Sequence, residues 1–175
     1  CAVIVIGIDP GLTGALAFID TATGAVNIDE IPTRQRRTGG EVAKAVDGEA
    51  LSTLVRQRVP ADCAALSVCE NVRSFGRSDA ARGTAVDSLQ RSLGAIEAIF
   101  DVLRMPCALV DPQAWQRLYG LKGKTKEKRE HGALPAAIVT ARQLYPAAAP
   151  LLARVKDHNR AEALLIAHYG RSTLA

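Results

Sequence analysis

The sequence predicts a single α/β domain in which a mixed sheet of five strands is flanked by helices. Three consecutive apolar or alternating segments with short turns between them open the chain, and strand-like and helix-like segments alternate after them. Hairpin-joined strands pair antiparallel, whereas strands joined through a helix can pair parallel, so this order favours a mixed sheet. With 175 residues, 48% hydrophobic and 23% charged, the chain suits one globular domain over residues 1–175.

The first predicted strand, AVIVIGID, is a continuous run of mostly β-branched residues that ends in an acid, as expected of a buried central strand. PGLTG and TATG supply the turns to the next two strands. CAALSVCE is a second buried strand that ends in an acid. The five predicted strands are Ala2–Asp9, Ala15–Asp20, Ala25–Pro32, Cys63–Glu70 and Cys107–Pro112.

Helical periodicity follows the strands. In the longest helical segment, apolar residues recur as one stripe, which predicts a core-facing surface. The predicted helices are Glu49–Arg58, Ser88–Leu103, Gln113–Leu121, Ala136–Leu144 and Asp157–Tyr169. The polar, basic segment Thr33–Gly48 and the segment Asn71–Thr84 are predicted loops. This order of elements matches the ribonuclease H-like fold.

The composition limits the partners. The net charge of +4 and the pI of about 9.0 permit an anionic partner such as nucleic acid. No apolar run reaches the roughly 20 residues of a membrane span, and no signal peptide is visible, so we expect an intracellular protein with no membrane partner. The four cysteines are scattered without a CxxC pair, which predicts reduced, structural thiols.

Two carboxylates end predicted buried strands. Asp9 closes the first strand and Glu70 closes the strand after the first helix. Functional groups gather at the carboxyl ends of parallel strands, and two carboxylates held together there repel each other unless a cation lies between them. Mg²⁺ or Mn²⁺ suits such oxygen ligands. Either acid taken alone would more often be an ordinary strand-end or turn-capping carboxylate.

The predicted C-terminal helix carries polar groups in its first turn, before a segment that must be buried. His158 and Glu162 are four residues apart and therefore share one face of the helix. Glu162 would be costly to bury without a partner, and a metal would supply one. Asp157 is a candidate helix N-cap or a metal ligand, and His158 is either a surface side chain or part of the site.

The motifs GIDPGLTGA and DHNRAEALLIA, together with the strand end at Glu70, resemble those of the RuvC-type Holliday junction resolvases. The similarity is to the phage and bacterial branch and to its plant chloroplast relatives. The segments QAWQRLYGL, GKTKE and QLYP also match, so the resemblance covers nearly the whole chain. Asn159 departs from the usual glycine, and His158 stands where many relatives have an acid.

The resemblance implies a structure-selective endonuclease that resolves four-way DNA junctions as a homodimer. Hydrolysis with two Mg²⁺ ions per active site would give paired symmetric nicks, with Mn²⁺ as a substitute. The residues that match the family's catalytic and metal-binding set are Asp9, Glu70, His158 and Glu162, and Asp157 is an additional candidate metal ligand. The long helix Ser88–Leu103 would then combine core packing with a dimer contact.

Candidate DNA-binding residues form three groups. The first is a run of cations, Lys122, Lys124, Lys126, Lys128 and Arg129, which beside a phosphodiester site favours phosphate contact over a merely solvated surface. The second is Phe75 between Arg73 and Arg77. Phe75 either stacks on bases at the junction or packs onto the core. Arg34, Arg36 and Arg37 are a less specific third patch.

Three alternatives are open at this point. A nuclease acting on RNA–DNA hybrids or other branched DNA would use the same metal site. GIDPGLTGA also resembles the first phosphate loop of actin-like ATP-binding domains, but the chain lacks the second domain and second phosphate loop those proteins need. A non-catalytic DNA-binding relative would be expected to have lost acids of the set.

The resemblance also implies a location for the protein. It would be the cytoplasm of a bacterium or phage host, or a chloroplast if a leading segment precedes Cys1.

Overall fold

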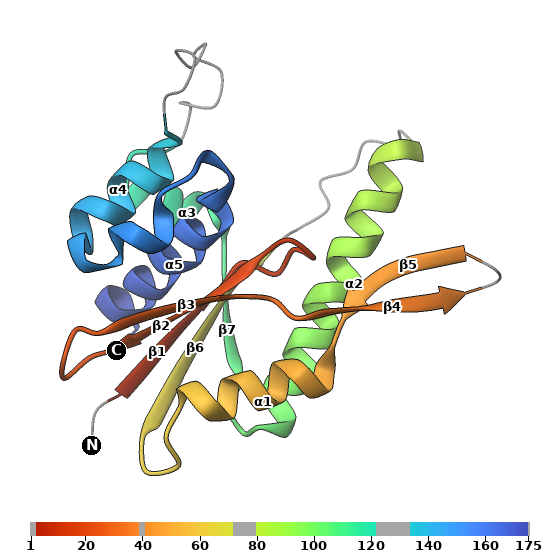
Figure 1. Ribbon diagram of the computed structural model, residues 1–175, viewed down its shortest axis with the longest axis horizontal. Helices are drawn as coiled ribbons and strands as arrows, with labels where there is room; N and C mark the ends of the chain where they lie inside the picture. Colours follow the sequence, from red (N-terminus) through yellow and green to blue (C-terminus); the bar gives the residue numbers. More distant parts are fainter. Residues whose placement is uncertain (1–2, 39–40, 72–79, 122–133, 175) are drawn as a thin grey trace.

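The computed structural model describes residues 3–38, 41–71, 80–121 and 134–174 (Figure 1). Its central sheet has five strands in the order β3-β2-β1-β6-β7. Their bounds are Val3–Ile8 for β1, Ala15–Asp20 for β2, Val26–Glu30 for β3, Ala64–Glu70 for β6 and Cys107–Val110 for β7. β1 pairs antiparallel with β2 and parallel with β6, and β6 pairs parallel with β7. The expected mixed five-stranded sheet is confirmed.

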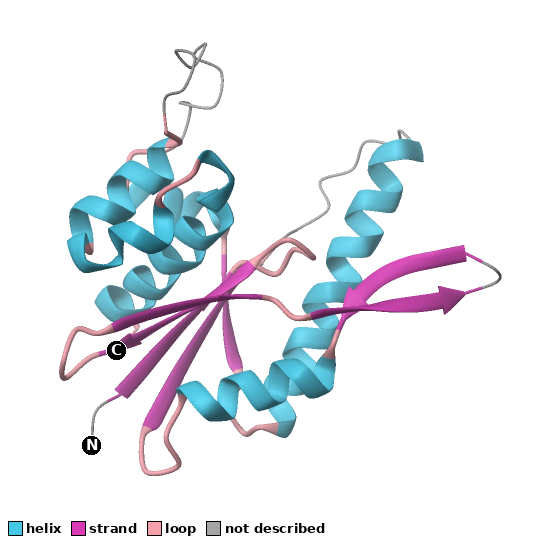
Figure 2. Ribbon diagram, viewed as in Figure 1, coloured by secondary structure: helices cyan, strands magenta, loops and turns pink. Residues whose placement is uncertain are grey.

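Helices cover both faces of this sheet (Figure 2). α1 and α2 lie on one face, and α3, α4 and α5 lie on the other. The helices are α1 (Gly48–Arg58), α2 (Ala80–Val102), α3 (Pro112–Leu118), α4 (Ala136–Leu144) and α5 (His158–Thr173), with 3₁₀ turns η1 (Pro146–Leu152) and η2 (Val155–Asp157) before α5. None of the helices in the described ranges combines the length and apolar character of a bilayer span.

The alternation of side chains in β1 divides the core into two layers. Ile4, Ile6 and Ile8 pack with residues of α1 and α2, whereas Val5 packs with α4 and α5. All four side chains are buried, so β1 is apolar on both faces, as a central strand must be. The expected stripe on α2 also reaches this core, where Leu93, Ile96 and Phe100 are buried.

Gly7 lets α5 approach β1 unusually closely. A Cβ atom at Gly7 would collide with the carbonyl oxygen of Ala163 and the amide nitrogen of Ala167. Both contacts are to helix backbone, which cannot swing aside as a flexible side chain can. The small residues of α5 and this glycine together seat the helix directly on the strand.

The segment expected to be a loop, Thr33–Gly48, is mostly a β-hairpin, so that interpretation is wrong. β4 (Thr33–Thr38) and β5 (Glu41–Val46) pair antiparallel as a separate two-stranded sheet. Among its described residues, only Val46 at the root is buried, so the hairpin lacks the apolar alternation that marks a half-buried strand. The Gly39–Gly40 pair between the strands is a hairpin signal that the sequence does carry.

Other boundaries also differ from expectation. α3 ends at Leu118 and not at Leu121, and α5 continues to Thr173, beyond the predicted end at Tyr169. α2 begins at Ala80, so the predicted loop Asn71–Thr84 is wrong over its last five residues. Tyr145 ends α4 as expected, but the Pro- and Ala-rich stretch after it forms the 3₁₀ turn η1. The predicted helices Glu49–Arg58 and Ala136–Leu144 are confirmed to within one residue.

The close contact at Gly7 gives a test of the packing. We expect Gly7→Ala to lower the free energy of unfolding by about 1–3 kcal/mol, the usual range for overpacking a core. Equilibrium denaturation in urea measures this loss. Gly94→Ala on α2 is the matched control, because an added Cβ there meets nothing within 4 Å and should stabilise the helix by up to ~1 kcal/mol. Equal stability of Gly7→Ala and the wild type would contradict the proposed close packing.

Candidate functional site at the carboxyl edge of the sheet

Asp9 directly follows β1, in a turn that holds its carboxylate in place. Its backbone N–H donates to the carbonyl of Ala15 at 3.0 Å, and its Oδ1 accepts from the backbone N–H of Gly11 at 3.4 Å. A Cβ at Gly14 would collide with the carbonyl oxygen of Asp9, so only glycine lets the turn close this tightly. The PGLTG segment therefore fixes the backbone on which Asp9 stands.

Glu70 reaches the same edge from the neighbouring parallel strand. The last register pair between β1 and β6 is Ile8 with Cys69, so the residues that come next on the two strands are Asp9 and Glu70. The indole N–H of Trp115 on α3 donates to Oε1 of Glu70 at 3.2 Å. Trp115 is 1% exposed, so its donor is held rigidly and orients the carboxylate.

α5 brings Glu162 and His158 over this edge from the other end of the chain. Glu162 is partly buried and His158 is exposed. In the first turn of α5, the Asn159 side-chain amide donates to the carbonyl of Thr13 at 2.7 Å and to its hydroxyl at 3.2 Å. The residue that departs from the family motif therefore ties α5 to the turn that follows Asp9.

Burial raises the pKa of all three carboxyls, and repulsion between carboxylates adds to the shifts of Glu70 and Glu162. Burial, opposed by the Gly11 hydrogen bond and by the charge of His158, raises the pKa of Asp9 to about 6. Burial and then the charge of Asp9 raise the pKa of Glu162 to about 7. Burial, followed by the charges of Asp9 and Glu162, raises the pKa of Glu70 to about 7, although the Trp115 hydrogen bond lowers it. The three acids expected in one site therefore lie close enough to repel one another.

This arrangement suits a divalent cation by the chemistry of its donors. Carboxylate oxygens are the ligands that Mg²⁺ and Mn²⁺ prefer. A cation would offset the burial that raises all three pKa values and the repulsion that adds to the shifts of Glu70 and Glu162. Within the described ranges, no three His, Cys, Asp or Glu side chains already stand in the geometry of a metal site. Assignment of Asp9, Glu70, Glu162 and His158 as ligands therefore stays a prediction.

Asp157 does not play the helix-capping role that was one of the two expected for it. Although it occupies the N-cap position of α5, its side chain accepts no hydrogen bond from that helix. Instead it accepts from the backbone N–H of Arg154 at 2.8 Å and from the Arg154 guanidinium. These bonds hold the pKa of Asp157 below its usual value, so Asp157 stabilises the turn η2. Its metal-binding role stays a prediction, with both carboxylate oxygens engaged by Arg154.

Two residues near the site were missed by sequence reasoning. Asp111 follows β7 and caps α3 by accepting from the N–H of Gln113 at 2.7 Å. Its charge contributes to the raised pKa of Glu70. The available signal was the same one that found Asp9 and Glu70, an acid at the end of a parallel strand. Trp115 on α3 is a core residue whose indole N–H donates to Glu70.

Arg34, Arg36 and Arg37, the third candidate DNA-binding patch, lie on β4. The other expected DNA-binding residues lie outside the described part of the chain. They are Arg73, Phe75, Arg77, Lys122, Lys124, Lys126, Lys128 and Arg129.

Comparison with known proteins places the fold. Neither the protein-family models nor the curated protein sequences give a match. Among solved structures, RuvC of Thermus thermophilus in complex with a Holliday junction substrate aligns with a TM-score of 0.53 and 18% identity, covering 99% of this chain and 97% of that one. The chain has the RuvC fold. The expected ribonuclease H-like architecture is thus confirmed.

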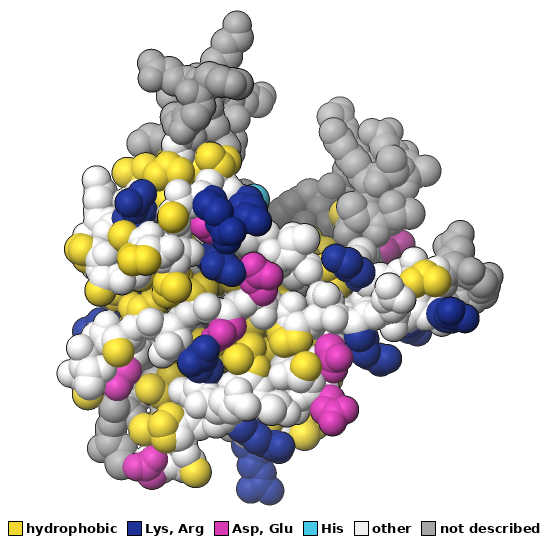
Figure 3. All heavy atoms as spheres, in the orientation of Figure 1, with side chains coloured by type: hydrophobic (Ala, Val, Ile, Leu, Met, Phe, Trp, Pro, Cys, Tyr) yellow, Lys and Arg dark blue, Asp and Glu magenta, His cyan; other side chains and the backbone are white. Residues whose placement is uncertain are grey.

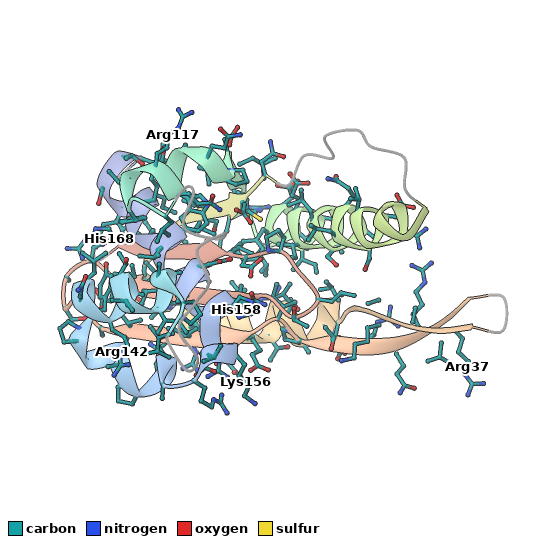
Figure 4. All side chains as sticks on the ribbon, turned by 90° about the horizontal axis from the view of Figure 1, so that it is seen from above. Arg37, Arg117, Arg142, Lys156, His158 and His168 are labelled. Atoms are coloured by element: carbon teal, nitrogen blue, oxygen red, sulfur yellow. The ribbon has the colours of Figure 1, made fainter. Side chains whose placement is uncertain are left out.

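A second T. thermophilus RuvC structure aligns with a TM-score of 0.42 and 18% identity, over 98% of this chain and 96% of that one. In the RuvC fold of this chain, Asp9, Glu70 and Glu162 come from β1, β6 and α5, three elements that meet at one edge of the sheet. His158 lies over the middle of the molecule, at the start of α5 (Figure 4).

The raised pKa values predict how stability depends on pH. Between about pH 4 and pH 7, the unfolded chain releases protons that the folded carboxyls of Asp9, Glu70 and Glu162 retain. The metal-free protein should therefore lose stability as pH rises through this window. Glu162→Gln removes one titrating group and part of the repulsion. The variant should therefore lose roughly 1–3 kcal/mol less of its free energy of unfolding over this pH range than the wild type does.

Thermal unfolding at pH 4.5 and pH 7.5, with and without Mg²⁺, measures this effect. Mg²⁺ should raise the Tm of the wild type at the higher pH only, because protonated carboxyls do not bind it. Burial lowers the pKa of His168, so this residue makes the protein more stable as pH rises. Its contribution is the same in the wild type and the variant and cancels when the two are compared. Equal pH dependence of wild type and Glu162→Gln would rule out the shared repulsion.

Proposed function

We propose that this protein is a divalent-metal-dependent endonuclease that cuts four-way DNA junctions. The observation that carries the proposal is the meeting of Asp9, Glu70 and Glu162 at one sheet edge, where the charge of Asp9 contributes to the raised pKa of both glutamates. The RuvC fold supports the choice of a junction as substrate, because the solved relative is bound to one. A pI of about 9.0 is compatible with a polyanionic partner.

The chain's own residues would divide the work as follows. Asp9, Glu70 and Glu162 would hold the Mg²⁺ ions, with Mn²⁺ as a substitute, and Trp115 would keep the carboxylate of Glu70 in position. Bound divalent ions activate a water molecule and stabilise the leaving oxygen during phosphodiester hydrolysis. The exposed imidazole of His158, close enough to Asp9 to lower its pKa, would act as a further ligand or move a proton.

Paired symmetric nicks require two active sites. The chain contributes one set of three carboxylates, so cutting two strands of one junction without release would need two copies of the chain. A homodimer is therefore part of the proposal. The stripe of α2 expected to serve both core and dimer contact is occupied by the core at Leu93, Ile96 and Phe100, which leaves the opposite side of α2 for a second copy.

The class of nuclease is tested by a panel of substrates. An immobile junction, a linear duplex and an RNA–DNA hybrid of matched sequence, each end-labelled, would be incubated in Mg²⁺, Mn²⁺ and EDTA. We expect symmetric nicks in the junction with either metal and none in EDTA. Preferential cutting of the hybrid would replace the proposed substrate with the nearest alternative, and ATP hydrolysis without cleavage would place the protein with the actin-like domains.

A variant of Asp9 tests the site itself. Asp9→Asn keeps the size of the side chain but removes its charge, so we expect junction cleavage to fall by at least about 100-fold while junction binding changes little. Gel-based cleavage and fluorescence-anisotropy binding measure the two effects. Asp62→Asn, at an exposed position before β6, is the control and should cut at the wild-type rate. A wild-type rate for Asp9→Asn in Mg²⁺ would remove Asp9 from the site.

A further inference from the structure

The β4–β5 hairpin (residues 33–38 and 41–46) projects from the body of the protein (Figure 1). Its strands pair only with each other, outside the five-stranded sheet. α2 packs against β5 near the root, and Val46 is the buried anchor there. The rest of both strands extends into solvent, where a six-residue strand spans about 20 Å. Such a long exposed ribbon calls for an explanation other than core formation.

The root of the hairpin is joined to the turn that positions Asp9. The backbone N–H of Ile31, two residues before β4, donates to the carbonyl of Gly14 at 3.1 Å. On the return strand, the N–H of Asp47 donates to the carbonyl of Pro32 at 2.9 Å. Because Gly14 ends the turn that begins at Asp9, the hairpin leaves the body at the carboxylate edge. Ligands held by the hairpin would therefore extend away from the candidate active site.

The hairpin is strongly cationic. Residues 33–46 include four basic side chains and one acidic one, Glu41. The basic residues Arg34, Arg36, Arg37 and Lys44 are all exposed. None of the four forms an ion pair with another described residue. Figure 3 shows Lys and Arg side chains along this arm, and Figure 4 places Arg37 toward its outer end, far from His158.

The register shows that both faces of the ribbon carry positive charge. Arg34 lies opposite Ala45 and Arg36 opposite Ala43, so one face presents two arginines beside two small residues. The other face presents Arg37 opposite Val42, and Lys44 opposite Gln35. Nothing bulky among these cross-strand neighbours shields either pair of cations. A two-stranded ribbon with positive charge on both sides is suited to a surface of closely spaced phosphates.

A protein partner fits this surface less well. Protein–protein interfaces have an apolar, often aromatic core that carries most of the binding energy. The hairpin has no aromatic residue, and the large exposed apolar side chain among its described residues is Val42, at 56% exposure. The observations therefore favour a polyanion.

We propose that the β4–β5 hairpin binds the sugar–phosphate backbone of a duplex arm of the DNA substrate, without regard to base sequence. This inference rests on the proposed function, because it assigns a second contact surface to the same substrate. The hairpin's length of about 20 Å corresponds to roughly six base pairs of duplex. The hairpin thus grips the arm beside the point of cleavage while the carboxylates act on the strand.

The test is the salt dependence of junction binding by Arg36→Gln/Arg37→Gln, which removes one cation from each face. Binding of a labelled junction is measured in EDTA, so that no cutting occurs, over a range of NaCl concentrations. Each phosphate that the variant no longer neutralises should reduce the slope of log K against log [salt] by about 0.9, and we expect binding at low salt to weaken about 5- to 30-fold. Junctions of unrelated sequence should be affected alike.

Arg56→Gln/Arg104→Gln is the charge-matched control. Both arginines are exposed, and they precede β6 and β7, at the opposite edge of the sheet. This control should change the salt slope little and the affinity less than about 2-fold, as expected when net charge alone is reduced. If the hairpin variant and the control behave alike, the hairpin inference is wrong. A changed oligomeric state of the hairpin variant in sedimentation would instead make the hairpin a contact between copies and also overturn it.

A second measurement needs no variant. Acetylation of Lys44 by an amine-reactive reagent, followed by mass spectrometry, should slow at least about 3-fold when the junction is bound, because phosphate contact shields the amine. An unchanged rate at saturating junction counts against the hairpin. The two proposals fail separately: a wild type that neither binds nor cuts junctions removes the proposed function, whereas normal binding and cutting with no hairpin effect removes this inference alone.

Discussion

The contact between the backbones of β1 and α5 determines the geometry of the whole site. Gly7 has no side chain to hold the helix away, and the helix presents the backbone of Ala163 and Ala167 to the strand. Asp9 lies two residues beyond Gly7, directly after the strand, and Glu162 lies one residue before Ala163 on the helix. The distance between the two acids is therefore set by main-chain packing, which is stiffer than contact through long side chains. Asn159, bonded to Thr13, ties the first turn of the helix to the turn that follows Asp9.

The same packing creates an electrostatic penalty. Partly buried acids that face one another favour the protonated form, and each ionisation at neutral pH works against folding. Proteins keep such arrangements at functional sites, where a bound cation removes the penalty and the pKa shifts reverse. Trp115 also favours the ionised form that a cation would bind, because its buried indole N–H donates to Glu70 and stabilises the charged carboxylate. The fold thus holds acids whose ionisation destabilises it at the place where the proposed reaction requires a bound cation.

The sequence predicted what depends on local pattern and failed where tertiary context decides. The apolar runs of β1 and β6 and the acids that end them were readable because a buried strand has few acceptable sequences. Glu162 was found because an acid inside an apolar helix needs a partner. By contrast, the β4–β5 hairpin resembles a loop because it lies outside the core and has no apolar alternation to report. Asp157 matches an N-cap signal, yet its carboxylate accepts hydrogen bonds from Arg154 and none from the helix backbone. Trp115 gave no sign of its hydrogen bond, which depends on how α3 packs against β6.

The distribution of the site along the chain has a consequence for how it forms. Asp9 lies near the beginning of the sequence, Glu70 in its first half and Glu162 in its final helix. Contacts between such distant segments require the closure of very long loops and form late in folding. During synthesis, a growing chain could build the β1–β2–β3 meander and dock β6, but it would still lack the helix that completes the carboxylate set. The candidate site therefore forms only when the last helix, α5, has been made and has packed against the sheet. A formed site thus indicates that the fold is complete.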